Sequence, residues 1–286
     1  MVEQIATGSA PDTARDAAVS DLELSLLLEA IRRFSGYDFG DYSQAMLKRR
    51  VAERLRAENV ETISGLQERV LHDPAALARF VLAMSSGHGR LFADPGFFAA
   101  FRINVVPLLR TYSFSRVWVP HCARGEDAYS LAAILHEEGL LERTMIYATD
   151  PSDLAVSAAK AGRFELDPGD DPDAAHRATG AIQPLSEVSS LDGNSLQFDE
   201  ALKRQIIFAR HALVTDGSLN EFQVILARDV LRQFNKALQF RVHNLFLNSL
   251  IRLGFLCLGS SESLALTPHE GVFRRFGNAA IYRRLR

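Results

Sequence analysis

The stretch RVWVPHCARGEDAYS, residues 116–130, decides the fold of this chain. The apolar residues Val117–Pro120 are typical of a short buried strand, and the turn CARGED, which contains Gly125, leads into the apolar-periodic segment EDAYSLAAILHEEGLL. A second apolar run, TMIYATD, ends in Asp150, roughly twenty residues beyond the turn. Nucleotide-binding folds place a carboxylate at this spacing on the ribose hydroxyls, so the stretch predicts a cofactor that contains a ribose.

The glycine pattern of the turn leaves a second interpretation open. Gly125 lacks the paired glycines that let a backbone approach a pyrophosphate. An ordinary connection between a strand and a helix in an α/β domain would show the same spacing. From these residues alone, both interpretations stand.

Composition indicates an ordinary globular protein. With 286 residues, 47% of them hydrophobic and 23% charged, the chain can form one large domain or two modest ones. Its net charge of −3 argues against a general polyanion binder. Cys122 and Cys257 lie far apart without a CxxC spacing, which predicts neither disulfides nor a thiolate metal site and favours a reducing cytoplasm. Residues 1–20 are small and polar and are expected to form a flexible leader, and no transmembrane segment is expected.

The first third of the chain has helical periodicity. The apolar spacing predicts an all-α domain of about four helices over residues 21–94. A longer helix, Pro95–Tyr112, is expected to lead into the first strand, with Asp94 as its N-cap and the proline in its first turn.

The second predicted helix is strongly basic. It carries Lys48, Arg49, Arg50, Arg54 and Arg56. Such a run is usually a solvated helix face, and the functional alternative in a chain of net negative charge is a docking surface for an acidic partner.

The rest of the chain alternates strands and helices. A helix is expected to end at Gly162, and residues 165–205, rich in Asp, Pro, Gly and Ser, are expected to form an insertion of loops and short strands. Beyond it we expect a long helix, Val230–Leu253, capped by Gly254, and the strands QIIFAR, FQVILA, FLCLG and AIYRR. Residues 95–286 thus predict an α/β domain with a doubly wound, mostly parallel sheet that binds ligands at the carboxyl ends of its strands.

Polar residues beside the turn suggest chemistry without defining it. His121 and Cys122 are adjacent in sequence, which makes neither a zinc set nor a catalytic triad, and we interpret them as the end of a strand in a cofactor loop. Glu126 and Asp127 could act as general bases, but the helix dipole also favours acids in a first turn.

Taken in order, these motifs resemble the chemoreceptor glutamate methyltransferase (CheR-type) family over roughly Leu24–Arg284. The family has an N-terminal helical domain and a Rossmann-like domain that binds S-adenosylmethionine (SAM). Its CSTGEEPYS and A-T-D motifs resemble CARGEDAYS and YATD here, and LxLGxSESL resembles LCLGSSESL around Gly259. The resemblance extends to GYDFGDYSQAMLKRRVAERL, FARHAL and ARDVLRQFN.

The resemblance implies roles for particular residues. It implies SAM as cofactor, with S-adenosylhomocysteine as product, and a SAM pocket formed by Cys122, Gly125, Glu126, Asp150, Leu213 and Arg228. The insertion corresponds to a β subdomain that grips a receptor tail in some members. The basic helix faces the receptor in the family, which favours the docking interpretation.

Several family residues are replaced in this chain. The family's N-x-T-x-F-F-R-D has Gly87, Gly89 and Ala93 in place of its Asn, Thr and Arg. Its CRNxxxYF is ARDVLRQF, with Asp229 and Gln233 in place of the Asn and the tyrosine, and the Asn of its N-L motif is Ala212. Arg90 or Arg124 is the candidate to replace the lost arginine.

Two classes of function follow from the sequence. One is a SAM-dependent protein methyltransferase of chemosensory signalling, with Arg90 and Arg228 as catalytic candidates and a chemoreceptor or another signalling protein as partner. The alternative is a catalytically degenerate module that keeps a nucleoside pocket and acts by binding. An NAD oxidoreductase is disfavoured by the missing glycines.

Overall fold

The computed structural model describes residues 10–85, 89–219 and 221–285, with side chains described from Ala17 onward except that of Ser85. The chain divides into two compact units, one up to Met84 and one from Ser85 onward. Each unit is described by itself.

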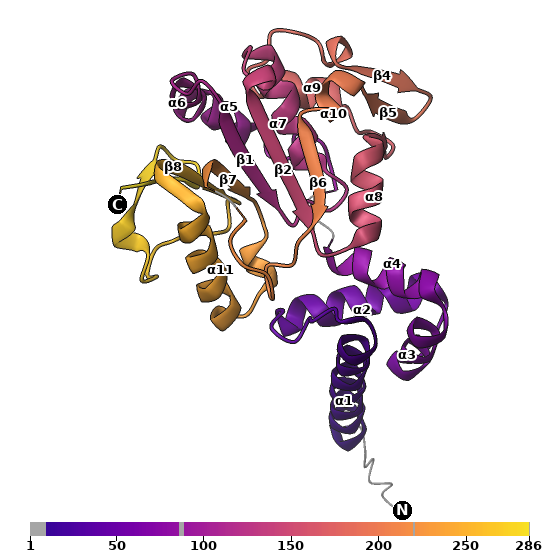
Figure 1. The fold of residues 1–286 in the computed structure, drawn as a ribbon. Helices are drawn as coiled ribbons and strands as arrows, with labels where there is room; N and C mark the ends of the chain where they lie inside the picture. The colour runs from indigo at the N-terminus through magenta and orange to yellow at the C-terminus, as the bar shows by residue number, and fades with distance from the viewer. Residues whose placement is uncertain (1–9, 86–88, 220, 286) are drawn as a thin grey trace, which may run out of the picture. The chain divides into compact units, whose positions relative to one another are not determined.

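The first unit is all-α, as the sequence predicts. Its helices are α1 Ala10–Ser35, α2 Gln44–Glu58, α3 Ile63–His72 and α4 Pro74–Ser85 (Figure 1). Leu27, Ile31 and Leu47 are fully buried at its centre. Because α1 already begins at Ala10, the expected flexible leader is wrong for residues 10–20, whose alanine-rich sequence favours a helix; residues 1–9 lie outside the described residues.

The second unit is built on a seven-stranded sheet, which confirms the predicted fold class. The order is β6-β2-β1-β7-β8-β10-β9. Neighbours from β6 to β8 pair in parallel, while β10 runs antiparallel to both β8 and β9. The strands are β1 Ser115–Pro120, β2 Thr144–Asp150, β6 Ile206–Arg210, β7 Phe222–Ala227, β8 Leu250–Leu258, β9 Phe273–Phe276 and β10 Ile281–Arg284.

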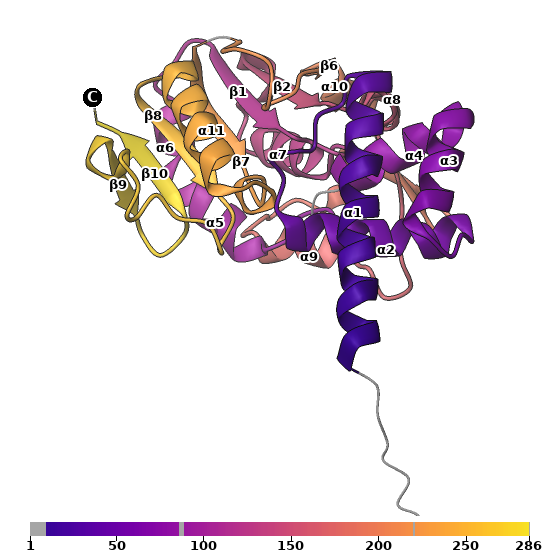
Figure 2. The same ribbon diagram turned by 90° about the horizontal axis from the view of Figure 1, so that it is seen from below.

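Helices cover both faces of this sheet (Figures 1 and 2). Val117 and Val119 belong to the same buried cluster as Phe98 and Phe101, whereas Trp118 points to the opposite face, where its ring centroid lies 5.6 Å from that of Phe246 on α11. The helices are α5 Pro95–Asn104, α6 Val106–Leu109, α7 Glu126–Glu137, α8 Asp153–Ala161 and α11 Lys236–Ser249. Short 3-10 turns lie at Leu141–Arg143, Leu185–Glu187, Leu231–Gln233 and Glu270–Val272.

The insertion forms a small sheet packed against α7. Its strands, in the order β3-β5-β4, are β3 Arg163–Glu165, β5 Ser195–Phe198 and β4 Ser189–Asp192, and its helices are α9 Pro172–Ala178 and α10 Glu200–Lys203. Tyr129 of α7 is fully buried, with its ring 5.5 Å from that of Phe164 and 4.9 Å from that of Phe198. These aromatic contacts attach the insertion to α7.

Two predicted helices differ from the structure. The expected helix Pro95–Tyr112 is divided into α5 and α6 at Val105, because Pro107 has no N–H to donate to the preceding turn. The expected helix Val230–Leu253 begins only at Lys236, where the Asn235 side chain caps it by accepting a hydrogen bond from the Leu238 N–H.

Gly254 is a strand residue and not a helix cap. It lies within β8, and a Cβ there would come within 3.0 Å of the carbonyl oxygens of Gln223 and Ile251. The close approach of neighbouring backbones therefore explains this glycine.

Candidate active site

The sheet reverses its direction of winding between β1 and β7. From β1 the chain continues to β2 on one side, whereas β7 lies on the other. In open α/β sheets, ligands bind at the carboxyl ends of the strands at such a switch point. The predicted polar residues gather there: His121 follows β1, Asp150 ends β2, and Arg228 follows β7.

Asp150 fastens the turn that follows β1. Its side chain is fully buried. One carboxylate oxygen accepts a hydrogen bond from the Ala123 N–H at 2.9 Å and lies 3.4 Å from His121 Nδ1; the other accepts one from the Ser152 N–H at 2.9 Å. The carboxylate therefore ties the loops after β1 and β2 together, and its contact with a ribose stays a prediction.

The backbone of the turn is left-handed at alternate residues. His121 has φ 55°, Ala123 has φ 50° and Gly125 has φ 94°. For residues other than glycine this conformation is strained, and it persists only where the surroundings enforce it. At Gly125 a Cβ would also lie 3.3 Å from the Tyr129 ring, so glycine satisfies both the conformation and the packing.

Glu126 is the titratable group of the turn. It is the first residue of α7 and is only 6% exposed. Burial raises the pKa of its carboxyl to about 7, against the opposing effects of backbone N–H groups and the Arg124 guanidinium. This carboxyl therefore titrates much closer to neutral pH than an exposed glutamate does.

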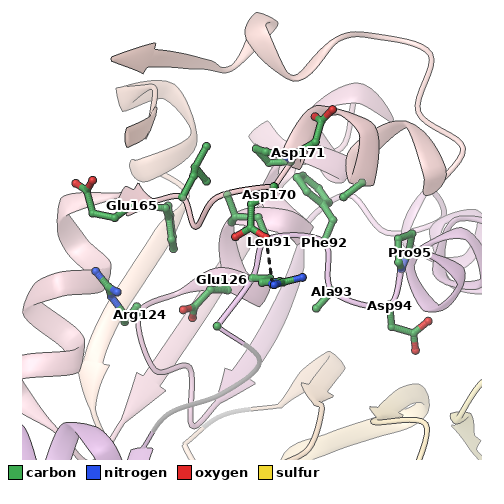
Figure 3. A pocket seen from close by; sticks show the side chains of 17 residues that line it. Leu91, Phe92, Ala93, Asp94, Pro95, Arg124, Glu126, Glu165, Asp170 and Asp171 are labelled. Atoms are coloured by element: carbon green, nitrogen blue, oxygen red, sulfur yellow. Dashed lines mark ion pairs between the residues drawn. The ribbon is translucent and has the colours of Figure 1, made fainter. Parts of the chain in front are cut away.

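Two cavities adjoin Glu126. The smaller, of about 20 Å³, lies among residues that include His121, Cys122 and Arg228. The larger, of about 380 Å³, lies between loop 89–95, the turn and the insertion (Figure 3). Only the larger one has the volume of an ordinary ligand pocket, which is about 300 to 1,000 Å³.

The charged residues that line the larger cavity are mostly acidic. They are five acids, Asp94, Glu126, Glu165, Asp170 and Asp171, and two arginines, Arg90 and Arg124, among apolar and glycine residues. Figure 3 shows the labelled acids coming from both walls, Glu126 from the turn and Asp170 from the insertion. Such a lining suits a ligand that carries positive charge.

Arg228 positions the loops around the site. Its side chain is 1% exposed and donates to Asp127 Oδ1 at 2.9 Å and to the Ala93 carbonyl at 2.6 Å. The guanidinium also lies 4.7 Å from the Phe97 ring centroid and 4.9 Å from that of Phe98. These contacts hold the loops around the site, and the catalytic and cofactor-binding roles of Arg228 stay predictions.

Cys122 and Leu213 are both buried. Burial raises the pKa of the Cys122 thiol well above its usual value, which keeps the sulfur neutral and unsuited to nucleophilic attack. Leu213 follows β6 and is 7% exposed, outside the lining of both cavities. Its contact with a cofactor stays a prediction.

Sequence reasoning missed the structural role of Glu262. This carboxylate is 7% exposed and accepts hydrogen bonds from the N–H groups of Gly259 and Asp229 on one oxygen and Arg232 on the other. It therefore joins the loops that follow β7 and β8. The SSES motif was the available signal, and a Cβ at Gly259 would lie 2.8 Å from the Asp229 nitrogen.

Comparisons with known proteins agree with this architecture. The family described as "CheR methyltransferase, SAM binding domain" matches residues 88–279, and "CheR methyltransferase, all-alpha domain" matches residues 22–85. The protein Cher3 of Pseudomonas putida is 40% identical over 254 residues, which cover 89% of this chain and 93% of that protein. A chemotaxis protein methyltransferase of Listeria monocytogenes is 25% identical over 256 residues, covering 88% and 94%.

The fold and the matched domains define a Rossmann-like methyltransferase that uses SAM as its cofactor. The chain belongs to the CheR methyltransferase family. The predicted family and cofactor are thereby confirmed. Within the described residues, no helix is long and apolar enough to cross a membrane, and no three His, Cys, Asp or Glu side chains are grouped as a metal site.

Asp150→Ala should destabilise the second unit and weaken SAM binding. It leaves two buried N–H donors without an acceptor, which predicts a loss of about 3 kcal/mol in the free energy of unfolding. Chemical denaturation and calorimetric titration with SAM measure the two effects. Asp153→Ala, an exposed acid at the start of α8, is the control. Unchanged stability in Asp150→Ala would show that the carboxylate does not fasten the turn.

SAM affinity should rise with pH between about 6 and 8. In the folded protein the pKa of Glu126 lies above its ordinary value of 4.5, so the free energy of unfolding without ligand falls as the pH rises from 4.5 to about 7. A cationic ligand favours the ionised carboxylate, so its binding strengthens as Glu126 loses its proton. Calorimetry in buffers of different ionisation enthalpy should detect proton release on binding near pH 7. Glu126→Gln should remove this pH dependence, and a persisting slope would assign it to another group.

Proposed function

We propose that this methyltransferase transfers the methyl group of SAM to a glutamate carboxylate of a protein partner of the chemoreceptor type. The observation that carries the proposal is the cavity of about 380 Å³, which connects Glu126 of the cofactor turn with the guanidinium of Arg90. The names of the Listeria relative and of a Pseudomonas aeruginosa relative, both chemotaxis protein methyltransferases, support this substrate class. The free thiols of Cys122 and Cys257 support action in the cytoplasm.

The residues of the turn suit SAM, which carries a sulfonium and an ammonium group. Glu126 would face these positive charges, Gly125 would allow close approach of the cofactor, and Asp150 would hold the turn and serve the ribose. When bound, SAM supplies the electrophilic methyl group. The acidic lining of the cavity favours this cation over a neutral nucleoside.

The acceptor needs positioning more than acid-base help. A glutamate carboxylate is already ionised at neutral pH, so in-line placement dominates the rate. Arg90 can hold it, because its side chain is 67% exposed and lines the cavity. The Arg124 guanidinium also lines the cavity, but its charge acts on Glu126.

The proposal is tested by methyl transfer from radiolabelled SAM to peptides that carry a receptor-type glutamate. Wild-type protein should label these peptides and should not label the same peptides with glutamine in place of glutamate. Saturable SAM binding without any labelling would favour the degenerate binding module. If SAM does not bind at millimolar concentration, the assignment of the cofactor pocket is wrong.

Ala93→Arg should raise the transfer rate. The Ala93 side chain lines the cavity while its carbonyl is held by Arg228, so an arginine can extend into the cavity with the loop unchanged. Better placement of the acceptor is worth up to about a hundredfold in rate. Ala93→Gln, which adds length without charge, is the control in the same assay. An equal rate in both variants would mean that a guanidinium at this position is not what the wild type lacks.

Restoring the family's tyrosine at Gln233 is a less suitable experiment. It is 5% exposed, donates to the Asp229 carbonyl and lies outside the lining of the cavity. A tyrosine there would overfill a packed site, which usually costs about 1 to 3 kcal/mol. The single Ala93 variant is therefore the cleaner experiment.

The basic surface of α2 is smaller than the sequence suggests. Arg50 is buried and donates to the Met84 carbonyl, and Arg54 pairs with Glu58. These two arginines make contacts within the first unit, so we leave them out of the docking surface that we propose. The exposed cations Lys48, Arg49 and Arg56 remain, within about 100° of arc on one helix face.

Glu58 explains why Arg54 is held inside. Glu58 is 8% exposed. Its Oε1 lies 2.8 Å from Arg79 Nε and 2.5 Å from Arg54 Nη2. Hydrogen bonds from Arg79 first, and then from Arg54, lower the pKa of Glu58 to about 2. This carboxylate therefore joins α2 to α4 at any pH above that value.

Reversing Arg49 and Arg56 to Glu should weaken capture of an acidic partner. The reduction should be about tenfold at low salt and smaller at high salt, since exposed charges are screened. Surface plasmon resonance with the receptor signalling domain measures it. Reversal of Arg32 and Arg33, exposed on α1, makes the same charge change elsewhere in the unit. Equal losses in the two double variants would assign the effect to net charge alone.

A further inference from the structure

One ion pair crosses the larger cavity. Arg90 Nε lies 3.2 Å from Asp170 Oδ1, with the arginine side chain 67% exposed and the aspartate 17% exposed (Figure 3). Arg90 comes from the loop before α5, whereas Asp170 comes from the insertion between β3 and α9. The pair therefore joins the two walls of the proposed acceptor site.

Asp170 is held in place by its own turn. Its N–H donates to the Asp167 carbonyl at 2.9 Å, and its second carboxylate oxygen accepts a hydrogen bond from the Asp167 N–H at 3.3 Å. Arg90, by contrast, has a long side chain with most of its surface in solvent. The carboxylate is thus the fixed member of the pair and the guanidinium the movable one.

Other acids of the cavity have different partners. Asp171 caps α9 by accepting a hydrogen bond from the Ala174 N–H, and Asp94 caps α5. Glu165 lies 3.3 Å from Arg163. Among the described residues, Asp170 differs from these acids because it forms an ion pair with an arginine that lines the same cavity.

We propose that Asp170 is a specificity-determining residue that occupies on Arg90 the place of the acceptor carboxylate. This inference rests on the proposed function. An acceptor glutamate must displace Asp170 before it is positioned, and a carboxylate at low concentration does so poorly. A glutamate delivered by a docked protein reaches millimolar effective concentration and competes well. The pair therefore selects protein-borne glutamates over free carboxylates and short peptides.

Asp170→Asn tests this competition with little structural change. The amide keeps the shape of the side chain and retains an oxygen for the Asp167 N–H, but removes the charge that neutralises Arg90. The KM for a short glutamate peptide should fall about two- to fivefold, the range expected for an exposed ion pair. The peptide KM is measured at saturating SAM, because Asp170 also belongs to the acidic lining that favours the cofactor. Arg90→Gln should raise the KM, and Asp170→Asn should give no further gain in that background.

Asp167→Asn is the matched control. It removes one exposed carboxylate from the same turn but does not line the cavity. Its KM should equal that of the wild type. If KM falls equally in the two variants, the inference about Asp170 is wrong. It is also wrong if the wild type is active and KM is unchanged in Asp170→Asn. In both cases the proposed function still stands. No methyl transfer to glutamate peptides by wild type or Asp170→Asn would remove the proposed function and this inference with it.

Discussion

The buried carboxylate of Asp150 is the constraint on which the site depends. It accepts hydrogen bonds from the backbone of both loops that leave β1 and β2. Together with the Cys122 N–H, which donates to the Thr149 carbonyl, it helps to offset the left-handed backbone at His121 and Ala123. That backbone in turn starts α7 at Glu126 and aims its carboxyl at the cavities. A ribose ligand at Asp150 would thus bind to a group that already organises the turn.

Tyr129 connects the turn to the insertion. Its ring packs on Phe164 and Phe198, and its hydroxyl donates to the Ala159 carbonyl at 3.0 Å. The left-handed backbone at Gly162 favours glycine at the end of α8. Packing is a second reason, because a Cβ there would lie 2.7 Å from the Tyr129 hydroxyl. The insertion, and with it the wall of the cavity that carries Asp170, is therefore positioned by a residue of the cofactor helix.

The sequence predicted backbone elements better than side-chain environments. β2 and β7 follow the apolar runs TMIYATD and FQVILA residue for residue, because buried parallel strands need continuous apolar sequence. Periodicity could not show that Arg50 turns inward, since its partner Met84 lies on another helix. The Arg54–Glu58 pair, by contrast, has the i,i+4 spacing of a single helix and was available in the sequence. The strand, turn and helix around Gly125 were predicted from a local pattern, whereas the Arg90–Asp170 pair joins segments about eighty residues apart that share no local pattern.

Loop 89–95 shows how the acceptor side can change while the cofactor side is kept. Phe92 and Asp94 are left-handed, and the loop is held through its backbone by the Ser130 hydroxyl, which accepts from the Phe92 N–H, and by Arg228, which donates to the Ala93 carbonyl. Neither contact depends on the side chain at position 93. The same loop is therefore compatible with alanine or arginine at position 93. Under the proposed function, the arginine that binds the acceptor is then Arg90, which pairs with Asp170 of the insertion.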